Sequence, residues 1–503
     1  MPDKLTPTKE DLLRVMREHY REDDRELISR AYDFAAKAHD GRKRYSGDPY
    51  IIHPTAAAII LARIELPIAV IVAGVLHDVL EDTPASLNEI KKEFGEDVAS
   101  MVLGVTKLGT LKYRGVDRYA ENLRKMFMAM ASDVRVVFIK FADRIHNLRT
   151  LESVPESKRR RIALESLELY APIANRLGMG VLRGELEDLS FKYVYPKEYE
   201  WITSLVHDRL EKMTKYVHDI QGLAKADLRK AGLEIVNISG RTKHLYSLYR
   251  KLLNHDRDIT RIYDLVAMRI QLGSISDCYA ALGVIHSRWK PLKGRIKDYI
   301  SQPKPNGYRS LHTTVFCENG EIMEIQIRTP EMHRAAEYGV AAHWQYAEAG
   351  KRSRPTAARE LSWMKQFAKV QKEIGDNKQF LRNLERMKLD IFQSRIFVFT
   401  PKGDVIDLPE GATPVDFAYA IHTDVGNKCS AAKINGEIAS LDTALKSGDI
   451  VHITTDKNRK APNQDWLKFA KTTNARNKIK AFAKVGITDW IRKVVTERTL
   501  TGK

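Results

Sequence analysis

The spacing of apolar residues changes twice along the 503-residue chain, so no single uniform fold can account for it. From residue 8 to about residue 200, apolar side chains recur at i, i+3 and i+4, which predicts helices throughout. Helices are expected to continue to about Leu253. Residues 261–272 and 311–329 are instead strand-like, and the second run breaks at the hairpin signal Glu318-Asn319-Gly320. We expect this middle part to be a mixed sheet flanked by helices.

A third pattern begins at Ser394, after a charged helical connector over residues 351–390. Four short strand-like segments surround one helical segment, residues 414–426. This order is typical of a small β-grasp module. The length of the chain suits roughly three or four domains at about 150 residues each. The fold class that we predict is therefore multidomain α+β.

The formal net charge of +18 favours polyanionic partners, because Lys and Arg replace the counterions of phosphates. Residues 456–503 hold 13 Lys or Arg against 4 Asp or Glu, a net charge of +9 by subtraction. A solvated basic helix without a partner is the alternative explanation of this tail. The three cysteines are far apart and suit neither a disulfide framework nor a zinc site. The most apolar stretch, residues 66–76, is too short to cross a bilayer, so we expect a cytoplasmic protein without membrane contact.

Imidazoles and carboxylates gather in three early segments and indicate a metal site. His53, the pair His77-Asp78 and Asp143 form a mixed nitrogen and oxygen donor set, which suits Mn, Fe or Zn better than Ca. A bound ion would acidify a water molecule and neutralise phosphate charge. Taken singly, each histidine is more often a core residue. The recurrence of these groups on three successive helices favours the metal site and resembles the HD phosphohydrolase superfamily.

Two more carboxylates follow the second metal-binding segment. In GVLHDVLEDT we expect one helix, so that His77 and Glu81, and likewise Asp78 and Asp82, share a face. Glu81 and Asp82 could then orient the metal-bound water or protonate a leaving oxygen. The alternative for Asp143 is an ion pair with Arg144 or Arg149.

A second set of charged residues suits two bound nucleotides. Arg241 and Lys243 precede a helix on which Ser247 and Lys251 lie four apart, a cluster that can clamp a triphosphate. A run of cationic and aromatic side chains then provides charge for phosphates and faces for a base. This run comprises Arg295, Lys297, Tyr299, Lys304, Asn306, Tyr308, Arg309 and His312. Basic runs are also common on solvated faces, which is the alternative here.

Carboxylates complete this second set. Alternation puts Glu324, Gln326 and Arg328 on one face of a strand. Asp264 would supply a further carboxylate, so that Mg²⁺ bridges the donor phosphates while Glu324 takes a hydroxyl proton. Asp264 could equally cap a structure or pair with Arg261.

Eight segments occur in the order of one known family. They are HPTAAAIILA, LHDVLEDT, FADRIHNLRT, GRTKHLYSLYRK, IYDLVAMRI, PKPNGYRSLHTT, EIQIRT and EYGVAAHW. The chain thus resembles, over almost its whole length, the long RelA/SpoT homologues, enzymes that make and degrade the alarmone (p)ppGpp. The resemblance implies an all-helical HD hydrolase domain, a nucleotidyltransferase-like synthetase domain, a β-grasp TGS domain and the start of a further helical domain.

The resemblance also implies a role for each matching residue. The hydrolase ion, Mn²⁺, would be bound by His53, His77, Asp78 and Asp143, with Glu81 and Asp82 catalytic. The (p)ppGpp would contact Arg44, Ser46, Asn147 and Thr150. The ATP would contact Arg241, Lys243, Ser247, Lys251 and Arg269. The acceptor, GDP or GTP, would contact Arg295, Lys297, Lys304, Asn306, Tyr308, His312 and Gln326. Asp264 and Glu324 match the Mg²⁺ site, and Glu324 also matches the catalytic base.

Two features imply that both activities are kept. Synthetase-only members have lost the His-Asp set, which this chain retains together with Glu81-Asp82. The acceptor loop reads Arg295-Ile296-Lys297-Asp298, which resembles the basic form of bifunctional members. Tyr45 departs from the pattern, since some relatives have a second basic residue there.

The last part of the chain resembles a tRNA-contacting module. Residues 395–426 are similar to the TGS domain, in which His422 matches the histidine that meets the tRNA acceptor end. Helix capping or core packing is the alternative role of His422. Residues 461–480 resemble the start of the following helical domain. Zinc-finger and ACT-like regions have no counterpart here, so we expect a shortened or naturally short form, with uncharged tRNA and the ribosome as partners.

These observations predict a bifunctional enzyme of the stringent response. It would transfer pyrophosphate from ATP to the 3′-hydroxyl of GDP or GTP, and separately remove that group. The alternative is an RNA-binding regulator whose nucleotide sites are sensors without turnover. A sensor needs phosphate clamps but no catalytic carboxylates, which argues against it. The predicted domains are residues 1–200 (hydrolase with connecting helices), 201–350 (synthetase), 351–390 (linker), 391–455 (TGS) and 456–503 (start of the basic helical domain).

Overall fold

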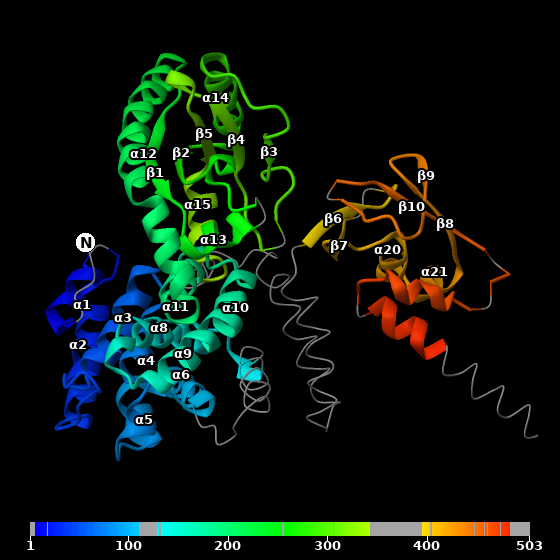
Figure 1. The fold of residues 1–503 in the computed structure, drawn as a ribbon. Helices are drawn as coiled ribbons and strands as arrows, with labels where there is room; N and C mark the ends of the chain where they lie inside the picture. Colours follow the sequence, from blue (N-terminus) through cyan, green and yellow to red (C-terminus); the bar gives the residue numbers. More distant parts are fainter. Residues whose placement is uncertain are drawn as a thin grey trace, which may run out of the picture. The chain divides into compact units, whose positions relative to one another are not determined.

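The computed structural model divides the chain into two compact units, Met1–Asn377 and Lys378–Lys503, and each is described by itself (Figure 1). The predicted linker lies outside the described residues, as do residues 483–503 of the predicted basic tail. The described residues are 6–17, 19–109, 126, 128–129, 132–253, 256–304, 306–342, 395–402, 405–446, 448–456, 458–459, 461–472 and 474–482.

The first unit begins with helices. They are α1 (Lys9–Met16), α2 (Glu22–Ala38), α3 (Ile52–Arg63), α4 (Ile68–Leu76), α5 (Val79–Asp82), α6 (Leu87–Gly109), α8 (Arg135–Arg149), α9 (Glu156–Glu165), α10 (Ala171–Arg176) and α11 (Gly180–Val194). Every residue of α3 from His53 to Ala62 is buried, because α3 packs between α1, α4 and α8. Among the described residues before α12, one isolated bridge between Lys43 and Pro49 is the only strand-like pairing, so the all-helical prediction is confirmed.

The helix predicted over GVLHDVLEDT is interrupted. The helix α4 ends at Leu76, His77 and Asp78 form a turn, and α5 begins at Val79. The prediction of one continuous helix is therefore wrong. The ring of His77 bonds to the Gly74 carbonyl through Nδ1 (2.8 Å), which competes with the backbone bond that would continue the helix. The Asp82 amide still donates to the Asp78 carbonyl (2.9 Å), so these two carboxylates remain close.

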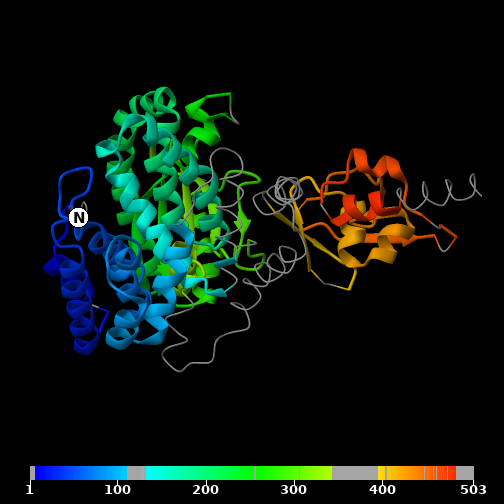
Figure 2. The ribbon, with the colours of Figure 1, turned by 90° about the horizontal axis from the view of Figure 1, so that it is seen from below.

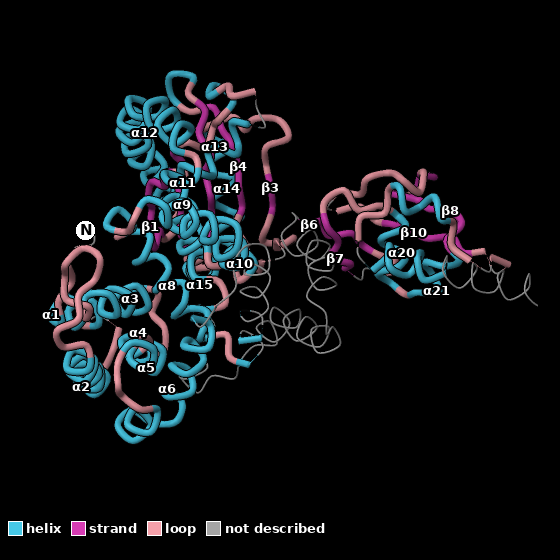
Figure 3. Tube along the Cα trace, turned by 60° about the horizontal axis from the view of Figure 1, so that its bottom comes forward, coloured by secondary structure: helices cyan, strands magenta, loops and turns pink. Residues whose placement is uncertain are grey.

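The second half of the first unit contains a mixed sheet, as predicted. It has five strands in the order β1-β2-β5-β4-β3. Only β2 and β5 run parallel. In Figure 3 the magenta strands β1, β3 and β4 lie apart from the first helices of the unit, α1 to α6. The strands are β1 (Ile235–Thr242), β2 (Val266–Leu272), β3 (Lys297–Asp298), β4 (Leu311–Phe316) and β5 (Ile322–Arg328), and the helices are α12 (Pro196–Lys230), α13 (Leu245–Leu253), α14 (Ile275–Arg288) and α15 (Pro330–Tyr338).

The strand β1 contradicts the prediction of helices up to Leu253. It lies at the edge of the sheet, and all of its residues are exposed or half-buried, so it lacks the buried alternation that identifies a strand. The long helices α12 and α14 cover one face of the sheet (Figure 2). That face is apolar: Met268, Ile270, Ile325 and Ile327 belong to one buried cluster with side chains of α12 and α14. Polar side chains are thereby directed to the opposite face.

The two halves of the first unit meet through backbone rather than side chains at one point, which we call the glycine joint (Gly178 and Gly339). Both glycines have positive φ, +73° and +56°. A Cβ on Gly178 would lie 2.8 Å from the Asn306 carbonyl oxygen, and one on Gly339 would collide with the Leu177 carbonyl. The Val340 amide donates to that same Leu177 carbonyl (2.9 Å). The joint therefore has no room for a side chain.

The second unit contains two small sheets around one helix. The strands β6 (Arg395–Phe399) and β7 (Val405–Pro409) form one sheet, and β10 (Val451–Thr455), β8 (Cys429–Ile434) and β9 (Glu437–Ala439) the other. A parallel bridge between Phe399 and Ile450 connects them. The helix α20 (Pro414–Ile421) is followed by the short α21 (Thr423–Lys428). All four predicted strand segments are present, whereas the single predicted helical segment is divided at His422, whose backbone is extended, into α20 and α21.

Residues beyond the predicted end of the TGS domain pack against α20. Trp466 and Ile479 share a buried cluster with Val415 and Tyr419. Asp416, which is fully buried, ties the two segments together. Its carboxylate accepts hydrogen bonds from the amides of Thr413, Lys471 and Thr472 and from both threonine hydroxyls, at 2.7–3.1 Å.

Replacement of Asp416 with alanine is expected to destabilise the second unit by about 2–4 kcal/mol, because several buried donors lose their acceptor together. Hydrogen exchange at the amides of Lys471 and Thr472 measures this loss directly. The matched control is Asp424→Ala, since the Asp424 side chain is 73% exposed and should contribute little. Unchanged exchange in Asp416→Ala would show that other contacts hold the segment.

Two candidate active sites

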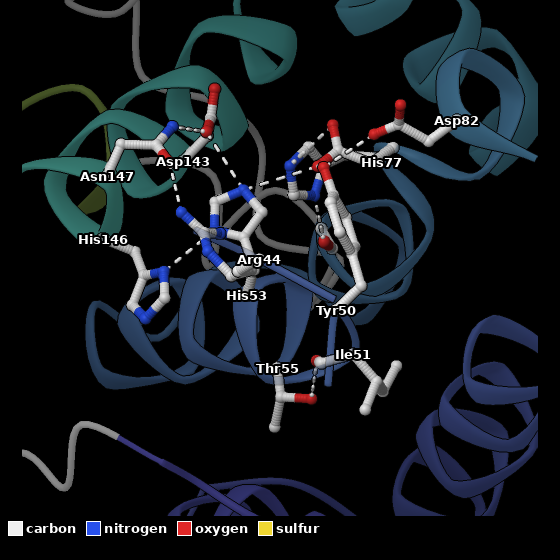
Figure 4. A network of polar contacts seen from close by, with 12 residues as sticks. Arg44, Tyr50, Ile51, His53, Thr55, His77, Asp82, Asp143, His146 and Asn147 are labelled. Atoms are coloured by element: carbon white, nitrogen blue, oxygen red, sulfur yellow. Dashed lines mark hydrogen bonds and ion pairs between the residues drawn. The ribbon is translucent and has the colours of Figure 1, made fainter. Parts of the chain in front are cut away.

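The first candidate site lies where α3, the turn after α4, and α8 meet (Figure 4). His53, His77 and Asp143 are all buried, and one ligand atom from each lies within 4.8 Å of the others. Asp78 lies beside this set, with carboxylate oxygens 3.2 Å from His77 Nε2 and 3.4 Å from His53 Nε2. The structure thus brings together the four residues that the sequence predicted as metal ligands.

The chemistry of the donors fits a divalent cation. His77 bonds to the Gly74 carbonyl through Nδ1, so Nδ1 carries a proton and Nε2 is directed into the centre, where its lone pair can bind a cation in place of a second proton. That Nε2 is buried and has no hydrogen-bond partner among the described residues. A buried nitrogen lone pair facing two carboxylates is the arrangement that transition-metal sites use.

Charges within the centre are strongly coupled. Burial opposes ionisation of both carboxylates, but His77 holds the pKa of Asp78, and Lys140 that of Asp143, below the usual range. Burial would lower the pKa of His77, yet Asp78 raises it to about 9. A proton therefore occupies this centre readily when no cation does, and the two compete for the same nitrogen.

Three residues around the centre were not predicted from the sequence. His146 lies with Nδ1 2.8 Å from His53 Nδ1, and Lys140 forms an ion pair with Asp143 (2.6 Å). The Tyr50 hydroxyl lies within hydrogen-bond distance of Asp78 (2.9 Å) and Asp82 (2.6 Å), which links a predicted ligand to a predicted catalytic group. The position of His146 in the segment FADRIHNLRT could have indicated its place in the site. No sequence pattern around Tyr50 indicates the contact of its hydroxyl.

Three of the four residues predicted to contact (p)ppGpp lie together beside this centre. Arg44 Nη2 donates to Asn147 Oδ1 (2.9 Å) and lies 3.3 Å from Thr150 Oγ1. Ser46 instead donates to Asp48 within its own turn (2.7 Å). Glu81 is an exposed residue near the centre, and partial desolvation raises its pKa, which suits a general acid.

The second candidate site lies on the polar face of the five-stranded sheet. Arg269 and His312 both pair in register with Gln326, and Lys297 pairs with His312. Paired residues on neighbouring strands project to the same side of a sheet. Strand register alone therefore places predicted ATP-binding and acceptor-binding residues on one surface.

One carboxylate of this surface has two lysine partners. Asp264, just before β2, accepts from Lys243 (2.5 Å) and Lys251 (2.7 Å). Burial opposes its ionisation, but the two lysines lower the pKa of Asp264. Its alternative partner Arg261 pairs with other carboxylates. Ser247, on the same helix as Lys251, donates to Glu187 of α11 (3.2 Å) rather than facing Asp264.

A chain of contacts surrounds the other carboxylate. Gln326 Nε2 donates to Glu324 Oε1 (2.8 Å), and His312 Nδ1 lies 3.3 Å from the same oxygen. The Tyr308 hydroxyl lies 2.7 Å from His312 Nε2. Burial would raise the pKa of Glu324, but the bond from His312 helps to lower it to about 2. Glu324 is therefore ionised and can accept a proton.

The remaining acceptor residues do not all join this cluster. Lys304 Nζ lies 4.5 Å from the ring centre of Tyr299 and 4.9 Å from that of Tyr308. Burial and the charge of Lys297 lower the pKa of Lys304 to about 8. Arg295 packs on Tyr263 (6.0 Å). Asn306 lies at the glycine joint, where its carbonyl approaches Gly178.

In the second unit, His422 begins α21 as its N-terminal cap. Its Nδ1 accepts from the Asp424 amide (3.2 Å), and 67% of the side chain is exposed. The capping alternative is thus present in the structure, and the rest of the imidazole remains accessible to a partner. None of the helices in the described part of the chain combines the length and apolar character needed to span a membrane.

Three segments match known protein families. Residues 31–180 match the HD domain, residues 240–351 the region found in RelA/SpoT proteins, and residues 396–455 the TGS domain. The first two segments contain the two candidate sites, and the third contains His422.

Three curated relatives share about the same identity with this chain. The GTP pyrophosphokinase of Myxococcus xanthus is 45% identical over 487 residues, covering 96% of this chain and 63% of the relative. The guanosine-3′,5′-bis(diphosphate) 3′-pyrophosphohydrolase of Aquifex aeolicus is 45% identical over 477 residues, covering 95% of this chain and 67% of the relative. The bifunctional (p)ppGpp synthase/hydrolase RelA of Mycobacterium tuberculosis is 45% identical over 505 aligned positions, covering 99% of this chain and 67% of the relative. The chain spans about three fifths of the length of the first relatives that it matches.

Proposed function

From the premise that the chain belongs to the RelA/SpoT family, we propose that it both makes and removes (p)ppGpp. Pyrophosphate would pass from ATP to the 3′-hydroxyl of GDP or GTP at the sheet, and would be hydrolysed off at the helical site. The observation that carries this proposal is the presence of two separate buried sets of catalytic groups, one around His77 and one around Glu324. Since the relatives extend beyond this chain, we confine the proposal to these two reactions.

For hydrolysis, His53, His77, Asp78 and Asp143 would hold a divalent cation, for which we propose Mn²⁺. Such an ion supplies an acidified water and neutralises phosphate charge when bound. Arg44, Asn147 and Thr150 would then bind the substrate at the edge of the centre.

The two further carboxylates of the hydrolase would divide the proton transfers. Asp82 is kept in place by Tyr50 and would orient the attacking water. Glu81, whose pKa is raised, would protonate the leaving oxygen.

For synthesis, the side chains of the polar sheet face would hold the two nucleotides. Lys243, Lys251 and Arg269 would bind the ATP phosphates, and Asp264 would bind the Mg²⁺ that we propose for this site. Lys251 and Lys243 now neutralise Asp264, and on nucleotide binding they would turn to the phosphates. Glu324 would accept the proton of the 3′-hydroxyl as the oxygen attacks the β-phosphorus of ATP, and the bond from that phosphorus to the α-phosphate oxygen would break to release AMP.

The acceptor would lie along Lys297, Lys304, Tyr308 and His312. The two lysines would carry charge for the 5′-phosphates of GDP or GTP, and Tyr308 would offer an aromatic face. We also propose that the second unit contacts the tRNA acceptor end through His422, and that the protein works in the cytoplasm, where its three free cysteines stay reduced.

A paired turnover assay on the purified chain tests the proposal. ATP and GDP with Mg²⁺ should give ppGpp, and ppGpp with Mn²⁺ should give GDP and pyrophosphate. Omission of each metal separately should stop the corresponding reaction only. Binding of both nucleotides without turnover of either would replace the enzyme with the sensor alternative.

The synthesis reaction is expected to weaken above about pH 8. Lys304 is charged below its lowered pKa of about 8, and its positive charge is lost as the pH rises through that value. The kcat/KM for GDP should therefore fall by about tenfold between pH 7 and pH 9, because this ratio reports ionisations of the free enzyme. The control is Lys304→Arg, in which the guanidinium stays charged. An identical alkaline decline in that variant would assign the ionisation to another group.

A further inference from the structure

Arg328, the last residue of β5, is a fully buried cation. The proposed binding of ATP and of the acceptor gives it no role. Its relative exposure is 0%, and it is among the largest fully buried side chains. Isolated buried charge costs several kcal/mol unless it is paired and hydrogen-bonded. Its nearest carboxylate oxygen, on Glu337, is 3.9 Å away, and that oxygen is already bonded to Arg269 at 2.9 Å. Burial lowers the pKa of Arg328 only to about 10, so the group stays charged near neutral pH.

Apart from the distant Glu337 carboxylate, Arg328 contacts two residues of the proposed acceptor site. Its Nη2 donates to Gln326 Oε1 (3.3 Å), and its guanidinium carbon lies 5.8 Å from the ring centre of Tyr308. The other guanidinium nitrogens, Nε and Nη1, are buried and have no hydrogen-bond partner among the described residues. A group so enclosed cannot reach a nucleotide by itself. Its effect on the reaction must pass through Gln326 and Tyr308.

The bond to Gln326 settles which way that amide faces. Arginine has donors only, and an ionised carboxylate has acceptors only. With Arg328 on one side and Glu324 on the other, the Gln326 oxygen must face Arg328 and its NH₂ must face Glu324. The observed distances of 3.3 Å and 2.8 Å fit this orientation. The reversed amide would set two acceptors against each other beside Glu324 and two donors against each other beside Arg328.

We propose that Arg328 is a positioning residue of the synthetase site: it orients the Gln326 amide and supports the Tyr308 ring, and thereby shapes the acceptor pocket next to Glu324. This inference rests on the proposed synthetase function. The alternation of β5 places Arg328 on the same face as Glu324 and Gln326, so the three side chains form a row of direct contacts along one strand. Removal of Arg328 would free the amide to turn over without removing any nucleotide contact.

A double-mutant cycle separates this role from general packing. The variants are Arg328→Met, which keeps most of the volume without charge, Gln326→Leu, and the two combined. We expect Arg328→Met to lower kcat/KM for GDP by about 30-fold, with KM for ATP changed less than twofold. In the Gln326→Leu background, Arg328→Met should lower kcat/KM for GDP by less than about fivefold, because the amide through which Arg328 acts is gone.

Several controls keep the outcome interpretable. Hydrolysis of ppGpp by each variant should equal that of the parent chain, since Arg328 lies outside the helical site. Arg288→Met, a partly exposed arginine on α14, should leave both reactions unchanged. If Arg328→Met does not fold, Arg328→Lys serves in the cycle, because lysine keeps charge and one donor but cannot contact Gln326 and Tyr308 together.

Two results would overturn the inference. Multiplicative losses in the double variant would show that Arg328 acts independently of Gln326, and an equal rise of KM for ATP would indicate a general structural role. GDP affinity by calorimetry provides a readout that does not need turnover. If the parent chain makes no ppGpp, the proposed function fails, whereas the cycle in GDP affinity still decides the role of Arg328.

Discussion

The His77→Ala variant is expected to hydrolyse ppGpp at least about 1,000-fold more slowly than the parent chain, because loss of a metal ligand removes several kcal/mol of charge stabilisation. His77 presents a buried nitrogen, Nε2, to the centre, 3.2 Å from the carboxylate of Asp78, and alanine leaves that position empty. Synthesis should change less than twofold, since Glu324 and its contacts belong to the other half of the unit. Single-turnover hydrolysis with saturating Mn²⁺, together with the metal content of the purified variant, measures both parts of this expectation.

A matched histidine checks that the effect is local. His422→Ala removes an exposed imidazole from the second unit and should leave both turnover rates unchanged in the absence of tRNA. Hydrolysis above about a tenth of the parent rate in His77→Ala, with stoichiometric Mn²⁺ still bound, would show that His77 is a core residue after all.

The Glu324→Gln variant is expected to lose pyrophosphate transfer by about 10²–10⁴-fold, the range that a positioned general base contributes. The amide matches the carboxylate in shape, so the contacts with Gln326 and His312 can re-form with little movement. It cannot accept a proton from the 3′-hydroxyl. Rapid-quench measurement of the first turnover distinguishes this loss from slow product release.

The control for Glu324→Gln is Glu318→Gln, in the turn between β4 and β5. That side chain is 47% exposed and pairs with Arg288, far along the strand from the site. Hydrolysis of ppGpp should stay at the parent rate in both variants. Pyrophosphate transfer at near the parent rate in Glu324→Gln would show that another group accepts the hydroxyl proton. The phosphates of ATP would be the first acceptor to test.

The residues that the sequence predicted best are those set by local pattern. Alternation along β5 was enough to place Glu324 and Gln326 on one face, and the burial of their neighbours Ile325 and Ile327 agrees with it. The hairpin between β4 and β5 followed from Asn319-Gly320, both of which have positive φ in the structure. In each case the periodicity or the turn residue is itself the physical cause of the geometry.

The features that were missed depend on particular side-chain and strand-pairing contacts that the spacing of apolar residues does not record. The break between α4 and α5 arises from a bond between the His77 ring and a carbonyl, which no apolar period records. The strand β1 owes its existence to pairing with β2, and its exposed residues conceal it. Tyr50 lies 28 residues before Asp78, and nothing in its own segment indicates that its hydroxyl contacts that carboxylate.

The glycine joint restricts how this chain can be recombined with those of its relatives. Exchange of the helical half for that of another protein would bring a new residue to position 178, opposite a backbone carbonyl of the sheet half. Any residue larger than glycine there would have to push the two halves apart, and no repacking of side chains could absorb the collision. The two halves should therefore be inherited as a matched pair, and functional chimeras should be found only among parents that carry glycine at both positions.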